Sequence, residues 1–198
     1  TRSGVDGVER GYQEAIEVDA IVANPPFVRR QNLSTAQRRD LTEFSRTHYN
    51  LNYKGDIAGN FLQLFGRMVK RGGRIAVILP AAALNATKMV KLWKSLIEHG
   101  IHPRAVIKQR PGPPGRFAHS NVEQVILVIQ RGGGPAEMVP VVQLLKPIED
   151  IALNQLAAAV LEPSGQTVRT DEFEIVISRD LERLPCQMWD SQCAFLDL

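Results

Sequence analysis

Residues 18–30 read VDAIVANPPFVRR, an apolar run that stops at an asparagine and two prolines. Residues 18–23 are short and almost continuously apolar, which is typical of a strand buried on both faces of a parallel sheet. Proline has no backbone N–H, and a residue that precedes proline is disfavoured in helical conformation. Asn24, Pro25 and Pro26 are therefore predicted to form a rigid bend at the carboxyl end of a strand.

The bend has two interpretations. Asparagine and proline often end a strand for local reasons alone. Average residue usage predicts an Asn-Pro-Pro-aromatic tetrapeptide by chance in about one chain in a thousand of this length. The tetrapeptide alone does not distinguish an ordinary turn from a functional site, so the interpretation depends on the surrounding sequence.

Strands and helices alternate after the bend. The expected strands are residues 74–80, 104–108, 121–131 and 173–178. The expected helices begin near Ser34, extend over residues 61–69 until Gly72 and Gly73, extend from an Asn85 cap to Gly100, and cover residues 148–162. This alternation predicts an α/β fold with a largely parallel sheet. Ligands of such sheets bind at the carboxyl ends of the strands, where Asn24 is expected.

Composition allows a globular domain with a mild preference for anionic partners. The chain has 198 residues, 44% of them hydrophobic, and a formal charge of +3. The basic residues gather in two groups, and each group is as consistent with a solvated face as with a nucleic-acid contact. The groups are Arg29, Arg30, Arg38 and Arg39, and Arg104, Lys108, Arg110 and Arg116.

The cysteines and the apolar segments argue against a metal site and a membrane. The two cysteines, Cys186 and Cys193, have no histidine nearby in the sequence, so no zinc site is expected. No apolar segment approaches the roughly 20 residues that span a bilayer, and the first residues lack a signal-peptide core. A reducing cytoplasm is the expected location.

The bend carries groups that suit the amino group of a planar base. The side-chain oxygen of Asn24 and the carbonyl oxygen of Pro25 can each accept one amino hydrogen, and Phe27 offers a ring for stacking. Two acceptors that point at the amino hydrogens stabilise the partly positive nitrogen of the transition state more than the neutral amine of the ground state. This chemistry requires no metal and no covalent nucleophile.

Three segments between residues 16 and 131 resemble one family, the amino-group methyltransferases that use S-adenosylmethionine. NPPFVRRQNL resembles the catalytic motif [Asn/Asp/Ser]-Pro-Pro-[Tyr/Phe/Trp] and its lead into a substrate-facing loop. GDIAGNFLQLFGRMVKRGGRIAVILP and RFAHSNVEQVILVIQR are similar to two later motifs, the second of which ends in a hairpin strand. The chain most resembles gamma-type N6-adenine DNA methyltransferases of type IIG and type I restriction-modification systems. The implied fold is a partial Rossmann-like sheet, mostly parallel with a late antiparallel strand, followed by a small α+β extension.

The resemblance implies roles for residues around the base. Asn24 and Pro25, with Pro26 fixing the bend, would accept the adenine amino hydrogens. Phe27 would stack on a base extruded from double-stranded DNA. Phe117 matches the aromatic residue that covers the other side of the base.

The same resemblance implies DNA and cofactor contacts. Arg29 and Arg30 would face the substrate, and Asn24 and Phe61 would lie at S-adenosylmethionine. Phe61 follows Asp56 by five residues, as the family aromatic does. Its place in an amphipathic pattern favours a plain core residue instead.

One motif of the family is missing. Its methionine-binding glycine loop and acidic ribose ligand precede the NPPF motif, and Gly132–Gly134 leads into PAEMVP rather than into a helix. Residues 1–134 are therefore expected to be the C-terminal half of a catalytic domain, and residues 135–198 an extension or the start of a target-recognition region. The chain alone is expected neither to bind S-adenosylmethionine nor to methylate. The expected partners are the N-terminal half and nuclease or specificity domains.

Other functions use the same motif. Related enzymes methylate guanine N2 in ribosomal RNA or glutamine in release factors, but they have a shorter and less basic segment after the bend than residues 28–56. A non-catalytic nucleic-acid-binding or assembly subunit that keeps half of the fold is a further alternative, which the missing glycine loop favours.

Overall fold

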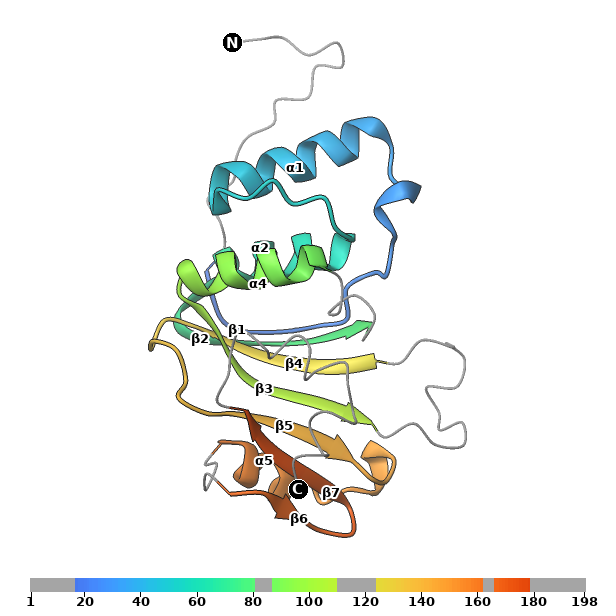
Figure 1. Cartoon of the computed structure of the whole chain (residues 1–198), viewed down its shortest axis with the longest axis vertical. Helices are drawn as coiled ribbons and strands as arrows, with labels where there is room; N and C mark the ends of the chain where they lie inside the picture. The colour runs from blue at the N-terminus through green and yellow to red at the C-terminus, as the bar shows by residue number, and fades with distance from the viewer. Residues whose placement is uncertain (1–16, 81–86, 110–123, 162–165, 179–198) are drawn as a thin grey trace.

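The computed structural model describes residues 17–80, 87–109, 124–161 and 166–178, which form a seven-stranded sheet with helices on it (Figure 1). The strand order is β1-β2-β4-β3-β5-β7-β6. The strands are β1 (Val18–Ala23), β2 (Val69–Pro80), β3 (Ile101–Gln109), β4 (Gln124–Arg131), β5 (Val139–Leu144), β6 (Val168–Arg169) and β7 (Phe173–Ser178). The helices are α1 (Thr35–Tyr49), α2 (Ile57–Met68), α4 (Thr87–Glu98) and α5 (Leu153–Leu161), with short 3-10 turns at Arg30–Asn32 and Ile148–Asp150.

Most strands of the sheet point the same way. β1 pairs in parallel with β2, and β3 pairs in parallel with β5. β4 lies antiparallel between β2 and β3, and β7 is antiparallel to β5 and β6. Strands β1, β2, β3, β5 and β6 therefore share one direction, and β4 and β7 oppose it. The predicted α/β class and the late antiparallel strand are confirmed.

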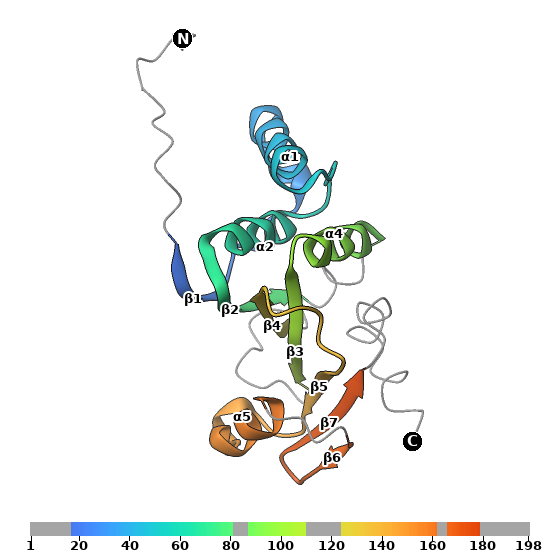
Figure 2. The same ribbon diagram turned by 90° about the vertical axis from the view of Figure 1, so that its left-hand side faces the viewer.

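The two faces of the sheet carry different helices. Helices α2 and α4 lie side by side over one face, with α1 outside α2 (Figure 2). The core beneath them includes Leu62, Leu92 and Val141. Val142 belongs instead to a second core that contains Leu156 of α5. Because neighbouring strand residues point to opposite faces, α5 covers the other face near β5 and β7.

The predicted start of α1 is confirmed, whereas strand β5 is missing from the prediction. The helix expected near Ser34 begins at Thr35, and Ser34 and Gln37 form a capping box. The sequence pattern weakens after residue 135 and predicts no strand at β5, whose run VPVVQL is short and contains Pro140. It nevertheless extends the sheet between β3 and β7.

The expected end of the second helix at Gly72 and Gly73 is wrong. Helix α2 ends at Met68, and β2 already begins at Val69, so both glycines lie inside a strand. A Cβ atom on Gly73 would lie 2.6 Å from the carbonyl oxygen of Asp19 in β1, and Gly72 has a φ of +89°. The glycines allow β1 and β2 to approach closely where their register shifts, rather than ending the helix.

Candidate functional site

The NPPF segment leaves the sheet directly after β1. Ala23, the last residue of β1, pairs with Val77 in the middle of β2, and β1 is the outermost strand in the described part of the sheet. Pro25 is buried, whereas Asn24 and Phe27 are exposed. The segment is thus held at the carboxyl end of a strand, as the sequence predicts. The predicted burial of that strand on both faces is wrong, because β1 lies at the edge of the described sheet and Val22 is 88% exposed.

The two predicted acceptors are free within the described part of the chain. Neither the Asn24 side chain nor the Pro25 carbonyl forms a hydrogen bond with a described residue. The Val28 amide donates to the Pro26 carbonyl at 3.1 Å, which tightens the bend immediately after them. An amide oxygen and a peptide oxygen on a rigid bend can together accept the two hydrogens of one amino group.

Three phenylalanines are predicted to serve the site at the bend: Phe27, Phe61 and Phe117. The Phe27 side chain is 40% exposed, so its ring is available for contact with a ligand. Phe61 is half-buried on α2, and its ring lies 5.7 Å from that of Phe65. This pairing supplies a packing role for Phe61 and leaves its predicted cofactor contact a prediction. Phe117 lies outside the described residues.

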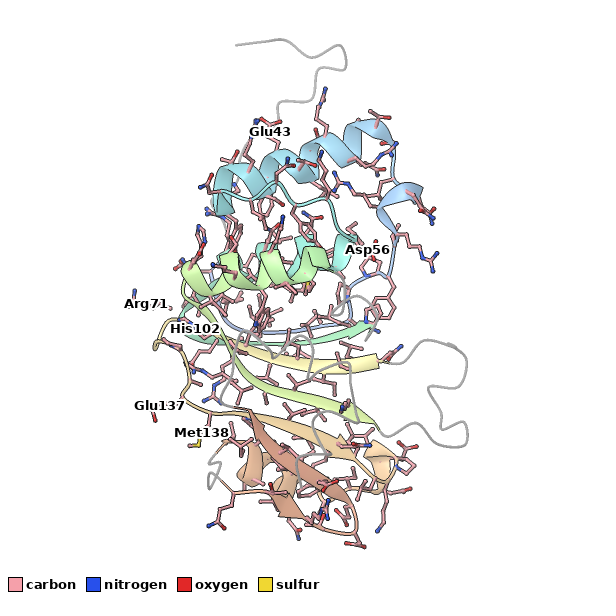
Figure 3. The ribbon with its side chains drawn as sticks, viewed as in Figure 1. Glu43, Asp56, Arg71, His102, Glu137 and Met138 are labelled. Atoms are coloured by element: carbon pink, nitrogen blue, oxygen red, sulfur yellow. The ribbon has the colours of Figure 1, made fainter. Side chains whose placement is uncertain are left out.

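The start of α2 supports the far side of the bend. The Ile57 amide donates to the Val28 carbonyl at 3.4 Å. The buried Tyr53 hydroxyl donates to the Asp56 carbonyl at 3.2 Å, in the turn that precedes α2. Burial, together with the nearby Asp56 carboxylate, raises the pKa of Tyr53, so this hydroxyl stays a neutral donor. In Figure 3, Asp56 lies at the start of α2, on the same side of the view as the carboxyl end of β2.

The two arginines after the bend have different surroundings. Arg29 is exposed. The Arg30 guanidinium donates from Nη2 to the Arg38 carbonyl at 2.7 Å and to the Thr42 hydroxyl at 2.5 Å, so it ties the bend to α1. Burial and the charge of Arg38 lower the pKa of Arg30, which remains protonated because arginine titrates far above neutrality. The structure thus gives Arg30 partners within the protein, which sequence reasoning missed.

Replacing Arg30 by glutamine is expected to destabilise the protein by about 1 to 3 kcal/mol, because the Arg38 carbonyl and the Thr42 hydroxyl lose a charged donor. Arg29→Gln is the matched control, and its effect is expected to stay within about 0.5 kcal/mol. Urea denaturation of both variants measures the difference. Equal free energies of unfolding for the two variants would show that the contact of Arg30 with α1 contributes nothing.

A buried polar network fixes α1 on α2. The Asn60 amide donates to the Ser45 hydroxyl at 3.0 Å, and that hydroxyl lies 2.5 Å from Gln63 Oε1. The Tyr49 hydroxyl donates to the Gln63 carbonyl at 2.5 Å, and burial raises the pKa of Tyr49 to about 12. All four side chains are buried. Because buried polar groups are costly when unpaired, this network favours one position of α1 over others.

The described residues contain neither a metal-ligand cluster nor a membrane span. No three histidine, cysteine, aspartate or glutamate side chains among them gather closely enough to hold a metal ion. No helix in the described segments is long and apolar enough to cross a membrane. Cys186 and Cys193 lie outside those segments.

Comparison with solved structures supports the fold. The type IIG restriction endonuclease BpuSI superposes with a TM-score of 0.63 at 19% identity, over 86% of this chain and 20% of that protein. The type I restriction-modification methyltransferase subunit from Streptococcus thermophilus gives 0.63 at 16% identity, over 91% and 38%. A Listeria monocytogenes protein described as a class I S-adenosylmethionine-dependent methyltransferase gives 0.57 at 16% identity, over 77% and 44%. The chain thus spans less than half the length of each of these proteins, and at such identities the likeness establishes the fold.

Sequence comparison identifies the family. Curated protein sequences give no match. The profile of the Eco57I restriction-modification methylase family matches residues 6–105, which is about half of the chain and includes the whole NPPF segment, α1, α2 and β2. The resemblance found in the motifs is thereby confirmed at the level of the family. The chain belongs to the Eco57I restriction-modification methylases.

Proposed function

We propose that this chain is the base-holding part of a DNA methyltransferase that transfers a methyl group from S-adenosylmethionine to the N6 amino group of adenine, within a restriction-modification system. The family match supports a methylase of this kind. The observation that carries the adenine assignment is a pair of acceptors, Asn24 Oδ1 and the Pro25 carbonyl, that bond to no described residue and lie in the same bend as the 40% exposed ring of Phe27.

The chemistry follows from these three groups. An exocyclic amine is a weak nucleophile because its lone pair is delocalised into the ring. Hydrogen bonds to Asn24 and Pro25 would hold the amine hydrogens and stabilise the positive charge that grows on nitrogen as its lone pair forms the new N–C bond. S-adenosylmethionine, when bound, would supply the electrophilic methyl group, whose bond to sulfur would break as the N–C bond forms and leave a neutral thioether. The extra amine proton would leave toward the Asn24 oxygen or solvent once the bond has formed.

The surrounding residues support a position for the cofactor and the DNA. Phe61 lies one turn of α2 beyond Ile57, whose amide contacts the bend at Val28, and its ring would lie at the cofactor. Arg29 is exposed and suits a DNA phosphate, while Arg30 would act by holding the bend against α1. Phe117 would cover the second side of the base. Residues 135–198 would lead toward target recognition, and specificity or nuclease domains would be partners.

Replacing Phe27 by alanine is expected to weaken the binding of an extruded base by about 1 to 3 kcal/mol, because the ring supplies stacking. Tyrosine and tryptophan at this position are expected to be tolerated, because both keep an aromatic ring. Because the Phe27 side chain is 40% exposed and only partly packed, its loss is expected to lower the free energy of unfolding by no more than about 1 kcal/mol. Fluorescence of 2-aminopurine at the target position reports extrusion, and thermal unfolding reports stability. Equal brightening with Phe27→Ala, or a large loss of stability, would assign Phe27 to structure.

The proposed function is tested by methyl transfer to DNA. The complete polypeptide that contains this sequence is incubated with S-adenosylmethionine carrying a tritiated methyl group and with double-stranded DNA. Label in DNA is the expected result, and ribosomal RNA and release factor serve as parallel substrates. Label confined to either parallel substrate, or found in none, would contradict the proposal.

A further inference from the structure

A row of polar side chains crosses the sheet far from the NPPF segment. Arg74 of β2 and His102 of β3 each pair directly with Gln130 of β4. Directly paired residues of neighbouring strands have their side chains on the same face, about 4.5 to 5.5 Å apart at Cβ. Ile75 belongs to the core under α2 and α4, so its neighbour Arg74 and the rest of the row lie on the opposite face. Figure 3 shows His102 at the end of the sheet opposite to Asp56.

Arg104 is fixed beside this row by neutral groups. Its Nε donates to Gln130 Oε1 at 2.8 Å, and its Nη2 donates to the carbonyl oxygens of Gly134 at 3.0 Å and Gly132 at 3.4 Å. Burial and the charge of Arg74 lower the pKa of Arg104. Arg74 is paired with the same Gln130 that Arg104 contacts, so two positive side chains flank one neutral residue. The oxygens that accept hydrogen bonds from Arg104 carry no negative charge.

The glycine run 132–134 makes room for two arginines. All three glycines have φ between +72° and +79°, a conformation that other residues rarely adopt. A Cβ atom on Gly132 would lie 2.9 Å from Arg71 Cγ, and one on Gly133 would lie 3.2 Å from Arg104 Nη2. The run therefore allows Arg71 and Arg104 to lie against neighbouring positions of one turn.

Within the described segments, three arginines at this end of the sheet have no acidic partner. Among the described residues, Arg71, Arg74 and Arg104 form no ion pair, and the nearby ion pairs use Lys70 with Asp19 and Arg131 with Glu17 instead. Figure 3 places Glu137 at the same end, and it also forms no ion pair with a described residue. Like charges that remain close without a counter-ion favour the binding of an anion.

His102 adds a second, independent observation. Its side chain is 6% exposed, and its Nδ1 atom has no hydrogen-bond partner among the described residues. A buried polar atom without a partner is costly and calls for an explanation. Burial and the positive charge of Arg104 lower the pKa of His102.

We propose that Arg74, Arg104 and His102, with Arg71 at the rim, form a binding site for a phosphate-type oxyanion, separate from the site at Asn24. Planar guanidinium groups offer several donors to such an anion, and an oriented guanidinium loses little freedom on binding. The anion would offset the repulsion between the positive charges of Arg74 and Arg104. Its source is either a small free phosphate or a phosphate of a nucleic-acid backbone.

Inorganic phosphate is the probe that tests this site. The purified protein is titrated with sodium phosphate up to about 10 mM, in the millimolar affinity range, and sodium chloride of equal ionic strength is the reference. Nuclear magnetic resonance follows the His102 ring and the Gly132–Gly134 amides. The expected result is saturable binding that shifts these signals and that weakens at least about tenfold in Arg104→Gln and in Arg74→Gln.

Two controls keep this test decisive. Arg46→Gln removes an exposed positive charge from α1 and is expected to leave phosphate binding unchanged. Arg74→Gln removes a side chain that has no described hydrogen bond, so its fold is expected to persist even where Arg104→Gln disturbs the glycine run. Phosphate binding that is absent, or that persists in Arg74→Gln with the signals of the fold unchanged, overturns the proposal.

The source of the anion is decided in a second arm. A short DNA duplex is added to protein saturated with phosphate. Displacement of phosphate that depends on Arg74 identifies a backbone phosphate, and continued phosphate binding in the presence of duplex identifies a small free anion. Either outcome supports the site, because both require Arg74 and Arg104.

Discussion

Replacing Asn24 by alanine is expected to lower methyl transfer by at least about 100-fold, the effect of removing one oriented group that stabilises charge in a transition state. The side chain is exposed and has no described hydrogen bond, so its removal costs the fold little. Initial rates of tritiated methyl transfer to DNA, measured with the complete polypeptide, give the effect. Binding of S-adenosylmethionine is expected to remain largely intact, because the acceptor serves the amine.

Asn24→Asp is the matched control for this prediction. Aspartate keeps an acceptor oxygen at the same position and also occurs in the motif that this segment resembles. It is expected to retain more activity than alanine. Turnover near that of the unaltered protein in Asn24→Ala would remove Asn24 from the reaction.

Replacing Gly59 by alanine is expected to destabilise the protein by about 1 to 3 kcal/mol, because the added methyl group has no space. A Cβ atom on Gly59 would lie 2.1 Å from the Tyr53 hydroxyl oxygen, and one on Gly55 would lie 2.2 Å from the same atom. The Tyr53 ring thus lies between Gly55, which precedes α2, and Gly59 in the first turn of α2. Movement of its ring would disturb the start of α2, where Ile57 contacts the NPPF bend. Both the free energy of unfolding and the methyl-transfer rate are expected to fall.

A double-mutant cycle separates this clash from an effect on helix propensity. Alanine favours a helix more than glycine by about 1 kcal/mol, so Gly59→Ala is expected to be neutral or stabilising once Tyr53 is replaced by alanine. Urea denaturation of the four proteins gives the coupling energy. Equal effects of Gly59→Ala with and without the Tyr53 ring would show that the ring does not limit this position.

The parts of the fold that the sequence predicts well are those with strong local signals. The apolar run 18–23 before two prolines predicts β1 and its bend, and the turn-forming residues around Ser34 predict a helix that begins there. Each of these signals lies within a few residues and depends little on the rest of the fold. The family assignment follows from the same local motifs.

The parts that the sequence misses depend on distant contacts. Gly72 and Gly73 end a helix in local terms, yet their place in a strand follows from the approach of β1, which lies about 50 residues earlier in the sequence. Strand β5 contains a proline and becomes part of the sheet through pairing with β3 and β7. Tertiary pairing overrides local preference at both places.

The candidate site shows the same division. The NPPF residues form a contiguous motif and can be proposed as a site from sequence. The contact of Arg30 with Thr42 and the enclosure of Tyr53 by two glycines depend instead on how α1 and α2 pack. The buried network of Ser45, Asn60 and Gln63 has no sequence signature, because each of these residues is usually exposed.

The identity of the methylated nucleoside tests the central claim most directly. DNA is treated with the complete polypeptide and S-adenosylmethionine whose methyl group carries deuterium, then digested to nucleosides and analysed by mass spectrometry. The claim predicts deuterated N6-methyladenine that is present with the unaltered protein and lost with Asn24→Ala. A deuterated methyl group on cytosine or guanine, or on adenine to the same extent in Asn24→Ala, would contradict it.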